Sequence, residues 1–323
     1  MRSRQKSTWS QPRNRRFAVV AVVAATAAPL LAGCGGSDKK DPLSDSGSGS
    51  KPSGDTVVVG SNNFAESTLI ADIYGEALKA KGIKVSYKPN IGTRETSYGL
   101  LKNGSITVLP EYNGALLAYL DPKAVPNSAA ATDAAVTAKL DPKLTLLKDA
   151  PAEDKDSLTV NAATAAKYHL TADSTIADLA KHGSEIAIGG SPEFQTRQQG
   201  LVGLKSEYGL TPKSFKALDA GGTLTEAALK NNNVQAADIF TTDVTIAQEK
   251  FVVLKDPKNL FGFENVVPLV YKSGLSQPGV DALNAVSAKL TTEALLDLDA
   301  EVQSDKKDPL DVATTWLKSV GLV

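Results

Sequence analysis

The feature that most constrains the fold is an alternation of short β-branched segments with helical segments, which begins at Thr56 and continues to residue 272. In the first repeat, residues 56–60 (TVVVG) form an apolar run that ends in glycine, and residues 66–81 place apolar side chains at helical spacing. Strands that alternate with helices pair in parallel and carry helices on both faces of the sheet. We therefore expect an α/β fold.

The remaining elements follow from the same patterns. The expected strands are short apolar runs, at residues 56–60, 83–88, 106–109, 157–161, 185–190, 215–219, 236–240 and 266–272. The expected helices have helical spacing or Ala-rich composition, at residues 66–81, 94–102, 123–138, 162–168, 176–181, 194–208, 224–231, 278–290, 293–302 and 310–320. Pro309 stands at the first position of the last helix, where its missing N–H is tolerated.

Two α/β blocks of similar size indicate two lobes. We place the first lobe at residues 56–156 plus 267–323 and the second at residues 157–266. In open α/β sheets, ligands bind beyond the carboxyl ends of the strands. A cleft between the lobes is therefore the expected binding site.

The N-terminal residues are typical of an export signal. Arg13, Arg15 and Arg16 precede an apolar run at residues 17–32, which is shorter than the ~20 residues of a membrane-spanning helix. The run ends in LLAGC (residues 30–34), which resembles a bacterial lipobox and contains Cys34, the one cysteine of the chain. We expect a signal peptide at residues 1–33, lipid attachment at Cys34, and a protein that is exported and lipid-anchored to the outer face of the cell membrane.

Residues 34–55 are rich in Gly, Ser, Asp and Lys and contain almost no apolar side chain. Such a segment cannot bury a core, so we expect a flexible tether. The formal net charge of −1 argues against a nucleic-acid partner, which usually requires a basic excess. With two histidines and one cysteine in the chain, we expect neither a His/Cys metal site nor a cofactor.

Four strand-to-helix loops stand out as candidates to line the cleft. They lie at residues 60–64, 110–114, 189–194 and 240–243. Three of them contain expected helix caps: Asn63 with Glu66 as its reciprocal partner, Ser191 before Pro192, and Thr242.

Aromatic side chains stand in all four loops. Phe64, Phe194 and Phe240 lie beside the expected caps, and Tyr112 lies in the loop without one. Aromatic faces attract a cation by about 0.5–2 kcal/mol each, and helix N-termini attract an anionic group. Together they suit a zwitterion, or an organic cation with a polar end.

Six segments carry a family resemblance over residues 56–323. In chain order they are GSNNFAES, IGTRE, LPEYNGALL, SPEFQTR, IFTTD and VLKDPKN. The set resembles the substrate-binding proteins of ABC transporters for quaternary-ammonium osmoprotectants such as glycine betaine, choline and carnitine. The resemblance implies a type II periplasmic-binding-protein fold, in which two α/β lobes are joined by a hinge and ligand binds in the interlobe cleft. It also implies no catalytic activity, and delivery of ligand to a permease driven by a cytoplasmic ATPase.

The resemblance also implies roles for single residues. Tyr112 matches a tyrosine of the family's aromatic cage, Phe240 falls where many members have another tyrosine, and Arg197 matches a candidate partner for the ligand's carboxylate. The chain departs from the pattern at Asn62, where members often have lysine, and at Ala115, where they often have a threonine.

Two further cage positions also differ. Leu158 stands where members often have tyrosine, and residues 219–229 contain no aromatic. Tyr98 is a candidate substitute whose spacing equally fits a buried helix face.

The sequence thus predicts an exported monomer that binds a small molecule. The expected ligand-binding residues are Ser61, Asn62, Asn63, Phe64, Tyr112, Asn113, Glu193, Phe194, Arg197, Phe240, Thr241, Thr242 and Asp243.

Three alternatives stay open at this stage. The chain could bind another small polar amine or an amino acid, or act as a receptor-like protein without its own transporter. An enzyme that uses Ser61, Glu111 or Asp243 is disfavoured, because none of the four loops contains a histidine to act as a base.

Overall fold

The computed structural model describes residues 56–323. The expected signal peptide, the tether and the lipid-attachment residue Cys34 lie outside the described residues. None of the described helices is both long and apolar enough to cross a membrane.

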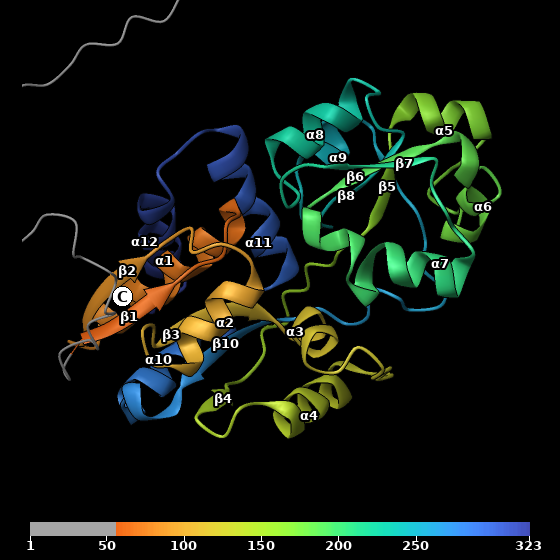
Figure 1. The fold of residues 1–323 in the computed structure, drawn as a ribbon. Helices are drawn as coiled ribbons and strands as arrows, with labels where there is room; N and C mark the ends of the chain where they lie inside the picture. Colours follow the sequence, from red (N-terminus) through yellow and green to blue (C-terminus); the bar gives the residue numbers. More distant parts are fainter. Residues whose placement is uncertain (1–55) are drawn as a thin grey trace, which may run out of the picture. The chain divides into compact units, whose positions relative to one another are not determined.

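The first sheet has five strands in the order β2-β1-β3-β10-β4 (Figure 1). Their bounds are β1 Thr56–Gly60, β2 Lys84–Lys88, β3 Val108–Tyr112, β4 Leu144–Leu146 and β10 Val266–Tyr271. β1 is parallel to both β2 and β3, whereas β10 is antiparallel to β3 and β4. The expected parallel pairing therefore holds only for one half of this sheet.

The second sheet also has five strands, in the order β7-β6-β8-β5-β9. Their bounds are β5 Leu158–Val160, β6 Ala187–Gly190, β7 Ser214–Ala217, β8 Ala236–Asp238 and β9 Val252–Val253. β6 is parallel to β7 and β8, and β5 is antiparallel to β8 and β9. The chain passes from the first sheet to the second through residues 147–157 and returns through residues 254–265. We call these two stretches the crossing segments.

Helices surround each sheet (Figure 1). Around the first sheet lie α1 Ala65–Lys79, α2 Arg94–Lys102, α3 Asn113–Leu120, α4 Ala129–Lys139, α10 Gln277–Ser287, α11 Thr292–Asp299 and α12 Pro309–Ser319. Around the second lie α5 Ala162–Tyr168, α6 Ile176–Ala180, α7 Gly203–Tyr208, α8 Thr223–Lys230 and α9 Thr245–Gln248. The exact boundary between the lobes stays a prediction.

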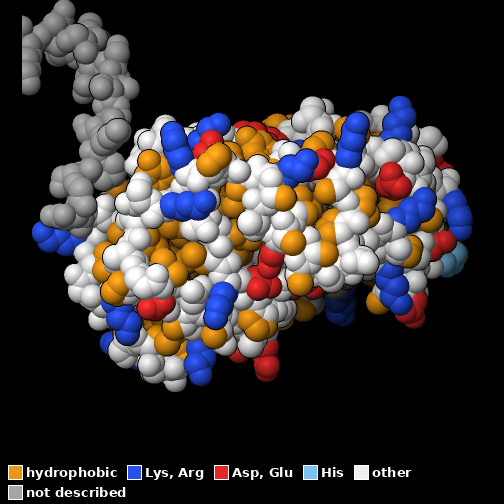
Figure 2. Space-filling model, turned by 90° about the horizontal axis from the view of Figure 1, so that it is seen from below, with side chains coloured by type: hydrophobic (Ala, Val, Ile, Leu, Met, Phe, Trp, Pro, Cys, Tyr) orange, Lys and Arg blue, Asp and Glu red, His pale blue; other side chains and the backbone are white. Residues whose placement is uncertain are grey.

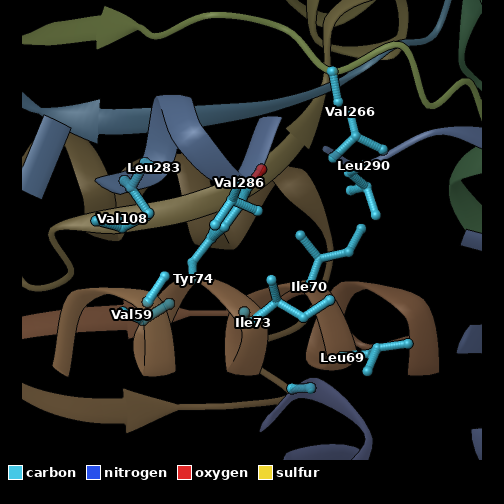
Figure 3. Packing of buried hydrophobic residues seen from close by; sticks show 14 of the residues in the cluster. Val59, Leu69, Ile70, Ile73, Tyr74, Val108, Val266, Leu283, Val286 and Leu290 are labelled. Carbon is cyan, nitrogen blue, oxygen red and sulfur yellow. The ribbon is translucent and has the colours of Figure 1, made fainter. Parts of the chain in front are cut away.

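The larger core lies between the first sheet and the helices α1, α10 and α12. α1 contributes Leu69, Ile70, Ile73 and Tyr74, each with no exposed surface. Figure 3 shows these side chains gathered with residues of the sheet and of α10. The helical spacing in the sequence therefore identified the buried face of α1 correctly. On the face drawn in Figure 2, Lys and Arg side chains are interspersed with Asp and Glu side chains.

Three expected local structures are wrong. Residues 110–112 belong to β3 and not to a loop, because Pro110, Glu111 and Tyr112 pair with the distant strand β10. The expected helix at residues 194–208 is interrupted, and only its last part forms α7. The helix expected at residues 123–138 begins at Ala129, where Ser128 Oγ accepts a hydrogen bond from Ala131 N at 3.1 Å.

The interruption before α7 has a tertiary cause. Gln199 Nε2 donates to Phe261 O at 2.8 Å and to Glu264 Oε1 at 2.9 Å, which ties the segment to the second crossing segment. Gly200 is extended, and a Cβ atom there would lie 2.1 Å from Phe194 O. Contacts with a distant segment thus replace the local helix.

Two of the three expected caps are also wrong. α1 has Phe64 at its N-cap, with no side-chain cap, and Glu66 bonds elsewhere. α9 has Val244 at its N-cap, and Asp243 rather than Thr242 accepts from Thr245 N, at 2.7 Å. Ser191 does stand at the N-cap of the short 3₁₀ helix Pro192–Gln195, although its side chain makes no cap hydrogen bond.

Candidate functional site

A small cavity of about 60 Å³ lies between the two lobes. Ligand pockets for drug-sized molecules are about 300–1,000 Å³, so this cavity suits a small solute. Residues of both lobes and of both crossing segments line it. The lining consists of an aromatic group, an acidic group, two arginines, and small or polar side chains.

The aromatic group consists of Phe64, Tyr112 and Phe240. The ring centroid of Phe64 lies 6.0 Å from that of Tyr112 and 5.2 Å from that of Phe240. Phe240 belongs to the second lobe and lies over Gly221, whose φ is +60° and whose Cβ position would be 2.7 Å from the Phe240 ring. A glycine is therefore required beneath this ring.

Glu66 connects the two lobes beside the aromatic group. Tyr112 donates its hydroxyl to Glu66, and Thr242 Oγ1 donates to Glu66 Oε2 at 2.7 Å. Burial, and then the neighbouring Asp299 carboxyl, raise the pKa of Glu66 well above its usual value. A protonatable carboxyl thus joins the start of α1 to the loop after β8.

The acidic group consists of Asp154 and Asp156 of the first crossing segment, Glu264 of the second, Asp238 at the end of β8, and Glu193. Burial raises the pKa of Asp154, Asp238 and Glu264 well above the usual range. Burial also raises the pKa of Asp156, although Arg197 and Arg94 oppose the shift. These carboxyls resist ionisation unless a cation comes close.

Both arginines of the lining already have carboxylate partners. Arg94 Nε donates to both carboxylate oxygens of Glu111 at 3.0 Å, and this pair is buried. Arg197 Nη2 donates to Glu95 at 3.0 Å, and this pair links the lobes at a partly exposed position. Neither Glu111 nor Glu95 lines the cavity. The charges of Arg197 and Arg94 still lower the pKa values of Asp156, Asp238 and Glu264, so the two arginines offset the acidic charge of the lining only in part.

The cavity lining includes seven of the predicted ligand-binding residues: Asn62, Asn63, Phe64, Tyr112, Glu193, Arg197 and Phe240. Their contact with a ligand stays a prediction. We expected the guanidinium group of Arg197 to bind the carboxylate of the ligand. In the structure it donates hydrogen bonds to the carboxylate of Glu95 instead.

Six predicted residues lie outside this lining. Ser61 bonds to Thr68 and Asn90, and Asn113 bonds to Asp133 and Asn265. Phe194 is 2% exposed and stacks on Phe215 in the core of the second lobe.

The other three of the six belong to the loop after β8. Thr241 is exposed and accepts a hydrogen bond from Lys155 N at 2.9 Å, while Thr242 and Asp243 are buried. Tyr98, the candidate cage substitute, is also absent from the lining. It packs in a separate cluster and accepts a hydrogen bond from Asp141 N.

Sequence reasoning missed most of the acidic group. Asp238 lies at the carboxyl end of β8, where cleft residues are expected. Asp154 and Asp156 precede β5, and Glu264 precedes β10; because β5 is antiparallel to β8 and β10 to β3, these starts lie at the same sheet edges as the carboxyl ends of β8 and β3. The run EDKD at residues 153–156, placed directly before an expected strand, was a usable indication. Within the described residues, no group of three or more His, Cys, Asp or Glu side chains has the arrangement of a metal site.

A family model matches residues 55–319 of the chain. It describes the substrate binding domain of ABC-type glycine betaine transport systems. The match covers both sheets and both crossing segments.

Known proteins resemble the chain over the same region. The glycine betaine-binding protein YehZ of Escherichia coli (strain K12) is 29% identical over 280 residues, which cover 82% of this chain and 90% of YehZ. A glycine-betaine-binding protein of Pseudomonas aeruginosa (strain PAO1) is 27% identical over 285 residues, 83% of this chain and 89% of the relative.

Among solved structures, a glycine betaine/carnitine/choline ABC transporter protein superposes with a TM-score of 0.65 at 24% identity. The superposition covers 82% of this chain and 99% of that one. It shows the type II periplasmic-binding fold of two α/β lobes.

Proposed function

Since the chain belongs to the family of substrate binding domains of ABC-type glycine betaine transport systems, we propose that its interlobe cavity captures a small organic cation or zwitterion for import. The substrate class of the family comprises glycine betaine, choline and carnitine, after which the relatives are named. The function is binding and delivery, and we assign no catalytic step to the cavity.

One observation carries this proposal: the cavity combines three aromatic rings with a surplus of buried carboxyl groups. Ring faces attract a cation by about 0.5–2 kcal/mol each. Carboxylates in a low dielectric attract a cation more strongly than they would in water.

Ligand capture proceeds by closure of the lobes. The ligand first contacts one lobe, and the crossing segments then allow the second lobe to close over it. Closure brings Phe240 and Asp238 of the second lobe against a ligand that lies on Phe64 and Tyr112 of the first. It also removes water from the cation, which strengthens its attraction to the rings and carboxyls.

Delivery follows from the position of the protein outside the cell. Cys34 holds the lipid anchor, and the tether of residues 34–55 lets the monomer reach a permease whose ATPase lies in the cytoplasm. The closed, ligand-bound form is the one that the permease recognises.

A thermal-shift screen of the purified protein tests the proposed function. The ligand set contains glycine betaine, choline, carnitine, amino acids and sugars. A ligand at one hundred times its Kd stabilises the folded state by about 2.7 kcal/mol. We expect cationic or zwitterionic compounds to raise the melting temperature; a response to sugars alone would overturn the proposal.

A further inference from the structure

Asp238 is a buried acidic side chain of the cavity whose hydrogen bonding is incomplete. It is 4% exposed, and its Oδ1 atom has no hydrogen-bond partner among the described residues. Burial, and then the like charge of Asp156, raise the pKa of Asp238. A buried acceptor without a donor costs about 1–3 kcal/mol, and more for a charged group.

Two other buried carboxyls of the lining have donors from the protein. Asp154 Oδ1 accepts from Thr242 N at 3.0 Å, and Glu264 Oε1 accepts from Gln199 Nε2 at 2.9 Å. The lining arginines donate to Glu111 and Glu95, which lie outside the cavity. No described side chain therefore supplies a donor to Asp238 Oδ1.

The aromatic rings cannot supply this donor either. Phe64 and Phe240 have no donor on their side chains. Phe64 packs against both Tyr112 and Phe240, so the three rings form one continuous surface. The hydroxyl of Tyr112 is already bonded to Glu66. An N–H group of a molecule bound in the cavity would supply a donor that the described residues lack.

We propose that the cationic head of the ligand carries at least one N–H group, which donates a hydrogen bond to Asp238 Oδ1. This inference rests on the proposed function, the capture of a small organic cation or zwitterion, and it places the fully methylated heads of glycine betaine, choline and carnitine second to heads that keep an N–H. The ligand head is a protonated amine, an amidinium or a guanidinium rather than a fully methylated ammonium.

A trimethylammonium head and a head with an N–H group interact differently with Asp238 Oδ1. A trimethylammonium group has no N–H, so it can approach Asp238 only through its methyl groups and leaves Oδ1 without a donor. An N–H group satisfies Oδ1 and adds a charge-assisted hydrogen bond, which is stronger than a neutral one. The rings still contact the methyl or methylene groups on the other side of the head.

Calorimetry with matched pairs of ligands tests this inference. Choline is compared with N,N-dimethylethanolamine, and glycine betaine with N,N-dimethylglycine, because each pair differs by one methyl group in place of one N–H. We expect the compound with the N–H to bind at least about tenfold more tightly in one or both pairs, since a hydrogen bond to a charged group contributes about 1.5–3 kcal/mol. Tighter binding of the trimethyl compound in both pairs would overturn the inference.

Two variants separate the hydrogen bond from general electrostatics. Asp238→Asn should reduce the preference for the N–H compound to about threefold or less. Glu193→Gln removes a less buried carboxyl of the same cavity and should weaken both members of a pair alike. An unchanged preference in a folded Asp238→Asn variant would contradict the role of this residue.

The outcomes also distinguish this inference from the proposed function. If every cation binds and the trimethyl compounds bind best, the proposed function holds and the N–H requirement fails. If neither member of any pair binds and no cationic or zwitterionic compound raises the melting temperature, the proposed function itself fails. The comparison of ligands on the unaltered protein stays informative even if Asp238→Asn does not fold.

Discussion

Tyr112 serves the cavity with two different parts of its side chain. Its ring extends the aromatic surface of Phe64, and its hydroxyl donates to the buried carboxyl of Glu66. Removal of the ring and removal of the hydroxyl should therefore have separable effects.

We predict that Tyr112→Ala and Phe240→Ala each weaken binding of the preferred cation by about 1–3 kcal/mol, because each removes a ring face. Tyr112→Phe should retain most of the affinity, since the ring is kept. Titration calorimetry on the three variants measures this.

Tyr119→Ala is the matched control, because Tyr119 is an exposed aromatic side chain outside the cavity lining. Its affinity should equal that of the unaltered protein. Full affinity in both cavity variants would discard the aromatic site.

The buried carboxyls predict opposite pH dependences for stability and for binding. Burial raises the pKa of Asp154, Asp238 and Glu264, while Arg197 and Arg94 partly oppose the shift for Asp238 and Glu264 respectively. Above about pH 4 the folded protein then holds more protons than the unfolded chain, so the free energy of unfolding falls as pH rises. A bound cation favours the ionised carboxyls, so its affinity rises over the same range.

We predict that cation affinity falls by about tenfold or more between about pH 8 and about pH 5. Over the same change, the ligand-free protein should gain stability from these groups. Asp299 neighbours Glu66, and burial raises the pKa of Asp299 to about 7. This carboxyl therefore changes its protonation state between about pH 5 and about pH 8. Calorimetry and urea unfolding at both pH values provide the two readouts, and affinity that is constant with pH would exclude these carboxyls from the binding step.

At the scale of elements, a buried ion pair between α2 and β3 positions the residues beside the cavity. Arg94 opens α2 and Glu111 lies in β3, and the guanidinium meets both carboxylate oxygens. Glu111 has no exposed surface. An ion pair in such a place orients the elements, although its net contribution to stability is small because both charges are desolvated.

Replacing only one residue of the Arg94–Glu111 pair should lower the free energy of unfolding far more than replacing both. We predict that Arg94→Ala lowers the free energy of unfolding by about 3–5 kcal/mol, because Glu111 is left buried and unpaired. The double variant Arg94→Met/Glu111→Met should recover most of this loss. Urea unfolding of both variants measures the difference, and equal losses would show that packing, not the unpaired charge, is responsible.

At the scale of the whole molecule, the contacts between the lobes include three pairs of different character. Phe64 meets Phe240, Glu66 accepts from Thr242, and Glu95 pairs with Arg197. The first two are partly or fully buried, whereas the side chains of the third are 43% and 32% exposed. The exposed pair is therefore the one that salt should weaken.

We predict a coupling of about 0.2–1 kcal/mol between Glu95 and Arg197 in ligand affinity, since the pair forms across the cleft and is partly solvated. A double-mutant cycle with Glu95→Ala and Arg197→Ala isolates this term from the other contacts of Arg197 with the cavity. The coupling should shrink when the ionic strength is raised. A coupling that is unaffected by salt would contradict the solvated pair.

Local patterns in the sequence accounted for much of the fold. β1 and α1 lie close to their expected positions, because a β-branched run and a 3.6-residue apolar spacing are properties of neighbouring residues. The same patterns failed at the start of α7, where Gln199 bonds to a segment more than sixty positions away. They also missed the short strands β4 and β9, whose three and two residues carry too little pattern.

The sequence by itself determined the two α/β blocks, the family resemblance, and three of the rings that line the cavity. Tertiary structure alone decided which charged side chains meet there, and it directed Phe194 into a core. The physical reason is distance along the chain: Thr242 bonds to Glu66 across 176 positions, and the crossing segments bring Asp154 and Glu264 to the same cavity. Helix and strand periodicity report only on neighbours, whereas the burial and charge of a cleft depend on how separate elements pack.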